Sequence, residues 1–97
     1  MTKVNIVFDD TYNDVDIIAV PDEIASKIET ISQEFLYWNP PVDDSDYWII
    51  INGKKYLAME TDGFIKWLNS SYCQKFIKAY VVARNTRYRP EYKIIKF

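Results

Sequence analysis

Histidine is absent from this chain of 97 residues, and cysteine occurs once, as Cys73. The first absence removes the side chain that most often acts as a general base or binds a metal ion. The second excludes an internal disulfide and a zinc site built from several thiolates. We therefore expect a protein that is not an enzyme and holds no metal or cofactor, and we interpret Cys73 as a structural residue.

Glycine and proline are also scarce, with two and four residues, while 48% of the residues are hydrophobic. This composition is not that of collagen-like, low-complexity or intrinsically disordered chains. No apolar run approaches the roughly 18 residues of a membrane-spanning helix, and Lys3 with its polar neighbours does not fit a secretory signal. We expect a single globular domain, 1–97, because domains usually contain about 100 residues. The single cysteine does not imply an oxidising compartment, so we expect this domain in the cytoplasm.

Charge is divided unevenly along the chain. Residues 1–50 hold two cations and eleven acidic residues, whereas residues 51–97 hold ten cations and three acidic residues. The net charge of −2 conceals this division. Two interpretations stay open: the halves neutralise each other within one fold, or they form a dipolar surface that binds a charged partner.

Alternating apolar and polar residues predict several strands. Residues 3–8 and 14–20 are expected to pair as a hairpin across a polar turn, and residues 92–97 form a closing strand. Residues 47–51 are apolar on both faces, which predicts a central strand. Asn52 and Gly53 then favour a two-residue type I′ turn, with residues 54–60 returning as the partner strand.

Two helices are expected between these strands. Pro21 suits the first turn of a helix, and an apolar stripe follows it to about Trp38, made of Ile24, Ile28, Ile31, Phe35 and Trp38. A second helix is predicted from an N-cap at Thr61 to about residues 71–73. Residues 75–84 fit either a helix or a strand, and the pair Val81 and Val82 favours a strand over 78–85.

The expected order is therefore ββαββαββ. It predicts an α+β domain in which an antiparallel sheet carries two helices on one face.

An acidic and aromatic segment is the first candidate for binding another protein. Tyr and Trp dominate binding hot spots, and here they lie beside carboxylates that suit a basic groove. The first-choice contacts are Asp43, Asp44, Asp46, Tyr47 and Trp48, and the second choice is Asp9, Asp10 and Asp14. The competing interpretation is an ordinary connection whose aromatic residues cover the edge of the sheet.

The C-terminal segment offers an alternative, because it interleaves cations with tyrosines. Cations neutralise phosphates and aromatic faces stack on unpaired bases. The residues for this nucleic-acid interface are Arg84, Arg87, Tyr88, Arg89 and Lys93. A pI near 5.0 argues against a dedicated nucleic-acid binder.

Two stretches, residues 61–69 and residues 85–97, resemble small uncharacterised proteins of phages and mobile elements from low-GC Gram-positive bacteria. Proteins of that setting include anti-CRISPR and other anti-defence inhibitors, which act mostly by occluding a site on a host protein. The resemblance implies a setting and transfers no residue roles. Our leading hypothesis is a non-catalytic inhibitor of a host nucleic-acid-handling protein; a nucleic-acid-binding accessory protein and a self-associating subunit are the alternatives.

Overall fold

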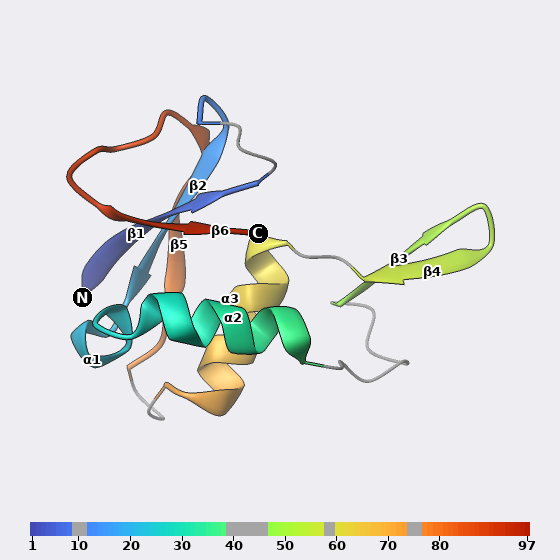
Figure 1. Cartoon of the computed structure of the whole chain (residues 1–97), viewed down its shortest axis with the longest axis horizontal. Coiled ribbons are helices and arrows are strands. Elements are labelled where there is room, and N and C mark those ends of the chain that lie inside the picture. Colours follow the sequence, from blue (N-terminus) through green and yellow to red (C-terminus); the bar gives the residue numbers. More distant parts are fainter. Residues whose placement is uncertain (9–11, 39–46, 58–59, 74–76) are drawn as a thin grey trace.

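The computed structural model describes residues 1–8, 12–38, 47–57, 60–73 and 77–97. In these residues the chain is a mixed helix-and-strand protein, about 31% helix and 38% strand. Its elements are, in order, β1 (Thr2–Val7), β2 (Val15–Val20), α1 (Asp22–Ala25), α2 (Ile28–Tyr37), β3 (Trp48–Ile51), β4 (Lys54–Leu57), α3 (Thr61–Ser71), β5 (Tyr80–Thr86) and β6 (Lys93–Lys96) (Figure 1). The segment between β2 and β3 thus holds one helix more than expected.

The main sheet has the strand order β5-β2-β1-β6. β1 and β2 form the predicted antiparallel hairpin, in which Val4 lies opposite Ile18. β5 pairs antiparallel with β2, so the strand interpretation of this region is confirmed over 80–86 and the helical one is wrong there. β6 runs parallel to β1. The prediction of a wholly antiparallel sheet is therefore wrong.

Residues 87–92 connect β5 to β6 across the face of the main sheet opposite the helices. The crossing is required because β5 and β6 lie at opposite edges and run in the same direction, an arrangement that a tight hairpin cannot make. The buried Asn5 side chain holds the connection: its Nδ2 donates to the carbonyl of Arg89 at 2.8 Å, and the Arg89 N–H donates to its Oδ1 at 3.0 Å.

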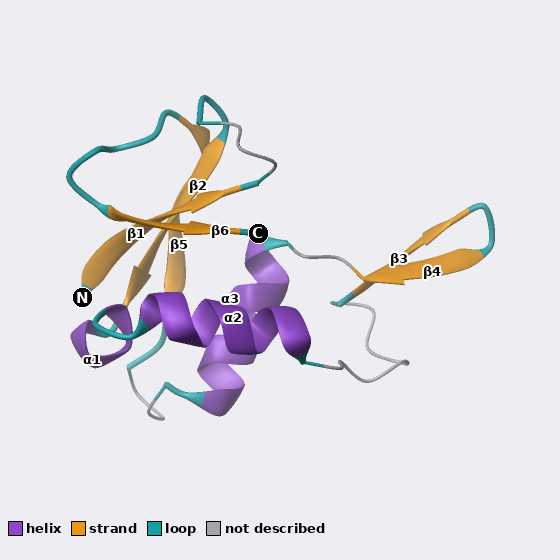
Figure 2. Ribbon diagram, viewed as in Figure 1, coloured by secondary structure: helices purple, strands orange, loops and turns teal. Residues whose placement is uncertain are grey.

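β3 and β4 form the hairpin that the sequence predicts. Ile51 pairs with Lys54, and between them Asn52 and Gly53 have φ values of 52° and 77°, the positive values that a type I′ turn requires. The two strands pair only with each other, however, and stand apart from the main sheet (Figure 2). The prediction that residues 47–51 form a central strand is wrong, because an apolar run by itself does not distinguish a buried strand from an exposed one.

The first predicted helix is divided into α1 and α2. The chain leaves the helical conformation at Lys27, which has a φ of −121°, and the Ser26 hydroxyl donates to the carbonyl of Glu23 at 2.8 Å. The expected apolar stripe is nevertheless buried along both helices at Ile24, Ile28, Ile31 and Phe35, and Trp38 packs half-buried against it.

The second predicted helix is α3, but its N-cap differs from the prediction. Glu60 precedes the helix and makes no side-chain capping bond. The Thr61 hydroxyl instead donates to Oδ2 of Asp16 at 2.5 Å, which ties the start of α3 to β2. Asn69 ties its end to the chain before β5, because its side chain both accepts from and donates to the backbone of Ala79.

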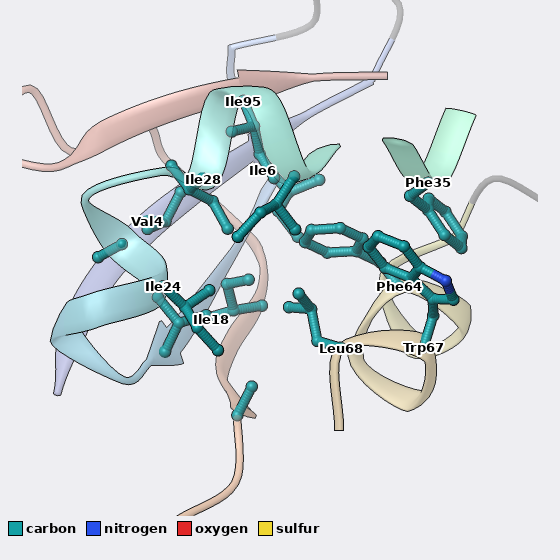
Figure 3. Close-up of a cluster of buried hydrophobic side chains, with 14 of the residues drawn as sticks. Val4, Ile6, Ile18, Ile24, Ile28, Phe35, Phe64, Trp67, Leu68 and Ile95 are labelled. Carbon is teal, nitrogen blue, oxygen red and sulfur yellow. The ribbon is translucent and has the colours of Figure 1, made fainter. Parts of the chain in front are cut away.

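The core lies between the helices and one face of the main sheet (Figure 3). Val4, Ile6 and Ile18 project from the sheet toward Ile28 and Leu68. Four aromatic rings continue the core toward the C-terminus: Phe64 lies 5.2 Å from Phe35, 6.1 Å from Trp67 and 5.1 Å from Phe97, measured between ring centroids.

Candidate protein-binding surface

The predicted protein-binding residues are only partly placed. Asp43, Asp44, Asp46, Asp9 and Asp10 lie outside the described residues, and Asp14 is exposed in the turn before β2. Tyr47 is 3% exposed, with its ring 4.9 Å from that of Trp38 and 5.2 Å from Nζ of Lys66. Trp48 is half-buried. Tyr47 therefore anchors the base of the β3–β4 hairpin and does not present its ring to a partner.

The outward side of α1 and α2 is acidic. The apolar stripe faces the core, so the polar positions of these helices face solvent. Lys27 is the single cation in residues 22–37, where the exposed acidic residues are Asp22, Glu23, Glu29 and Glu34. This surface belongs to the acidic half of the sequence, although the sequence analysis selected other members of that half.

Two adjoining hollows run along this surface and share Glu23, Ile24 and Tyr72. The first has a volume of about 310 Å³ and also contacts Met1, Asp22 and Ile77. The second, of about 420 Å³, also contacts Glu34 and one cation, Lys27. We call these six residues the acidic groove: Asp22, Glu23, Ile24, Glu34, Tyr72 and Ile77. It combines carboxylates with apolar surface, because Ile77 is 49% exposed beside them.

Two contacts shape the acidic groove. The Tyr72 hydroxyl donates to Oε2 of Glu34, and the Tyr72 ring packs edge-on against Trp67 with 5.5 Å between centroids. Tyr72 thereby joins α2 to the end of α3 and fixes the position of one carboxylate. Within the described part of the chain, Glu23 makes no side-chain hydrogen bond or ion pair, so its carboxylate remains available to a cationic partner.

Asp22 is held at the other end of the groove. Its Oδ1 accepts a hydrogen bond from the Thr2 hydroxyl at 2.6 Å and lies 3.2 Å from the amine of Met1. The Thr2 bond, and next the positive amine, lower the pKa of Asp22 below its ordinary value of 3.8, because both favour the ionised carboxylate. Asp22 is therefore ionised at neutral pH, and the amine of Met1 balances part of its charge.

The predicted nucleic-acid residues do not form one surface. Arg84 makes two bonds to Asp62 at the start of α3, at 2.6 and 3.2 Å, and this bidentate pairing raises the pKa of Arg84. Lys93 donates to the carbonyl of Ala25 on the helical side of the sheet. The other three, Arg87, Tyr88 and Arg89, lie in the connection from β5 to β6, which crosses the opposite face of the main sheet.

Arg89 is itself engaged by neighbouring groups. Its Nε lies 2.9 Å from Oε1 of Glu91, and its guanidinium is 6.0 Å from the centre of the Tyr92 ring, which Lys3 approaches to 5.8 Å. The ion pair raises the pKa of Arg89. Arg89, Tyr92 and Lys3 remain a small basic and aromatic cluster on this face.

The three ion pairs between described residues each join partners from the same half of the sequence. They connect Met1 with Asp22, Arg84 with Asp62, and Arg89 with Glu91. None of these pairs brings an acidic residue of 1–50 against a cation of 51–97. Asp16 acts on Arg84 across the two halves as a weaker influence.

Sequence reasoning did not identify Glu23, Glu34 and Tyr72 as one site. Tyr72 lies 38 residues from its hydrogen-bond partner Glu34, and only the packing of α2 against α3 brings them together. The sequence signal that could have pointed to this surface was the row of acidic residues in 22–37 on the side opposite the apolar stripe.

Described residues include no cluster of three or more cysteine and acidic side chains that would suit a metal ion. None of the helices in this part of the chain is long and apolar enough to span a membrane. A comparison with known protein families found no match, and searches of curated proteins and of solved structures found no significant match either.

Proposed function

We propose that this protein is a non-catalytic binding protein whose acidic groove receives a basic, partly apolar segment of another protein. The observation that carries the proposal is that Glu23 lines both hollows of the groove, with Asp22 and the exposed Ile77 in the first and Glu34 in the second. Carboxylates attract and orient a cationic partner, while apolar contacts supply affinity that does not depend on salt.

A protein that handles nucleic acid is the partner class we favour. Such proteins carry exposed Lys and Arg side chains to hold phosphates, and an acidic surface competes for the same cations. Occupation of that basic surface inhibits the partner by occlusion and needs no chemistry in this chain. The setting we propose for such an inhibitor is a phage or mobile element, where it would act as an anti-CRISPR or related anti-defence protein.

A designed peptide tests the binding mode without knowledge of the natural partner. The probe is a fluorescent amphipathic peptide of Leu and Lys, compared with a Leu and Glu peptide of equal length by fluorescence anisotropy. We expect the Lys peptide to bind, with an affinity that falls as salt is added, and we expect the Glu peptide not to bind.

The matched variants are Glu23→Lys inside the acidic groove and Glu29→Lys outside it. Both reverse one exposed charge on neighbouring helices. Glu23→Lys removes an attraction for the cationic peptide and adds a repulsion. At an exposed site this predicts about a tenfold loss of affinity. Glu29→Lys is expected to change affinity less than about twofold. Equal losses in both variants, or no binding of the Lys peptide, would contradict the proposal.

The basic and aromatic cluster of Arg89, Tyr92 and Lys3 favours nucleic-acid binding as a second candidate function. Its two cations lie within about 6 Å of one tyrosine ring, an arrangement suited to phosphate and base contacts. A labelled single-stranded oligonucleotide in the same assay separates the candidates. Tight, salt-sensitive binding of the oligonucleotide that is lost in Arg89→Glu supports this second function.

A further inference from the structure

The β3–β4 hairpin exposes more apolar surface than its two strands can cover. Ile50 is 70% exposed, Ile51 49%, Tyr56 48% and Ile49 39%. Cross-strand register places Ile49 and Tyr56 on one face, with Ile51 beside them, and Ile50 on the other face. A lone two-stranded hairpin is marginally stable in water, and an added strand would stabilise it. The exposed apolar surface of the hairpin is therefore suited to contact with a partner.

The base of the hairpin is fixed to the body of the molecule. Tyr47 is buried between Trp38 and Lys66, and Trp48 packs at the margin of the core. Beyond this base, the hairpin extends away from the helices and the main sheet (Figures 1 and 2). The exposed isoleucines are therefore presented on an anchored element.

Charge distinguishes the four edge strands of the two sheets. β4 begins with Lys54 and Lys55, β6 begins and ends with a lysine, and β5 contains Arg84 and register shifts in its pairing with β2. Charged side chains and bulges are the devices by which proteins prevent edge-to-edge association. β3, with the sequence Trp-Ile-Ile-Ile, carries none of these protections.

We propose that β3 pairs antiparallel with β3 of a second copy of this chain, forming a two-fold symmetric dimer with a four-stranded sheet in the order β4-β3-β3-β4. Because Ile51 and Lys54 close the turn, alternation in the β3–β4 ladder directs the backbone groups of Ile50 outward, where β3 of a second copy can pair with them. An uncharged strand is complementary to itself in a two-fold interface, because no like charges meet. Pairing through β4 would instead place lysines against lysines.

The expected dimer is weak, because a four-residue strand contributes much less area than a standard protein interface. The net charge of −2 opposes its formation only slightly. The dimer interface and the acidic groove involve different residues, so this inference does not depend on the proposed function.

Sedimentation equilibrium of the full chain, over concentrations reaching the high micromolar range, tests the inference. We expect the apparent mass to rise toward twice 11.5 kDa. Ile50→Lys places a charge on the paired edge and is expected to keep the chain monomeric throughout. Because Ile50 is largely exposed, this variant is expected to retain the wild-type circular dichroism spectrum.

The matched control is Val82→Lys, which makes the same chemical change at another exposed, β-branched position on an edge strand. Val82 lies on β5 and is 42% exposed. It is expected to leave the dimer unchanged. A wild-type chain that stays monomeric at every concentration overturns the inference, as does a dimer that survives Ile50→Lys. Loss of the dimer in Val82→Lys alone would assign association to β5 and overturn it too.

Discussion

The side chain of Asn5 and the backbone of Arg89, 84 residues apart in the chain, form a reciprocal pair of hydrogen bonds. Asn5 is fully buried in β1, and its Nδ2 also lies 3.3 Å from the carbonyls of Tyr92 and Lys93. One amide thus satisfies the polar backbone of the connection that crosses the main sheet. A buried backbone group without such a partner would be costly.

Replacement of Asn5 by Ala is expected to destabilise the fold by about 2–3 kcal/mol, because it leaves buried backbone groups unpaired. Urea unfolding followed by tryptophan fluorescence measures the loss. Asn13→Ala, at an exposed position, is the control and is expected to stay within about 0.5 kcal/mol of wild type. A similar small effect at Asn5 would mean that water replaces the amide.

Phe64 is the central ring of the aromatic core. Phe64→Ala is expected to cost about 3–5 kcal/mol, since it removes contacts with three neighbouring rings and leaves a cavity. Phe64→Leu retains more of the volume and is expected to cost less than about 1.5 kcal/mol. Thermal unfolding of the two variants measures the difference, and equal losses would show that the neighbouring side chains collapse into the space.

Gly53 tests the turn of the β3–β4 hairpin separately from the rest of the fold. A Cβ at this position would meet no atom within 4 Å, so Gly53→Ala introduces no clash and only the strain of a positive φ. That strain is about 1 kcal/mol. Amide hydrogen exchange in β3 and β4 is expected to accelerate about fivefold, with β1 unchanged. Unchanged exchange in the hairpin would argue against the type I′ turn.

Asp22 gives a prediction about pH. Its lowered pKa means that the Thr2 contact stabilises the folded state above the pKa of the unfolded carboxyl, and this stabilisation is lost as pH falls through the folded pKa. Thr2→Val is expected to raise the pKa of Asp22 toward 3.8 and reduce this loss in acid. NMR titration of the carboxyl carbon measures the shift, with Glu91 as an internal reference expected to be unaffected.

Local patterns predicted the local structure. Asn52 and Gly53 predicted their turn because backbone preference alone determines it, and the stripe from Ile24 to Phe35 predicted which side of the helices is buried. The parallel β6 was not predicted, because its pairing depends on a connection held by Asn5 from the other end of the chain.

The acidic groove was missed for the same reason. Its carboxylates come from residues 22–34 and its aromatic side from Tyr72, and no spacing within either segment reveals that they meet. The exposed β3 was missed because three consecutive isoleucines usually indicate burial. In both cases long-range packing, which is absent from local sequence patterns, decides where the surface lies.

The most direct test of the central claim, that a basic partner binds in the acidic groove, is an NMR titration of the ¹⁵N-labelled chain with the Leu and Lys peptide. The account predicts that the largest amide shifts occur at Glu23, Ile24, Tyr72 and Ile77. At equal peptide concentration these shifts are strongly reduced in Glu23→Lys, as about a tenfold loss of affinity requires, and are retained in Glu29→Lys. Shifts centred on Arg87 and Arg89, or spread over all exposed acidic residues alike, would contradict it.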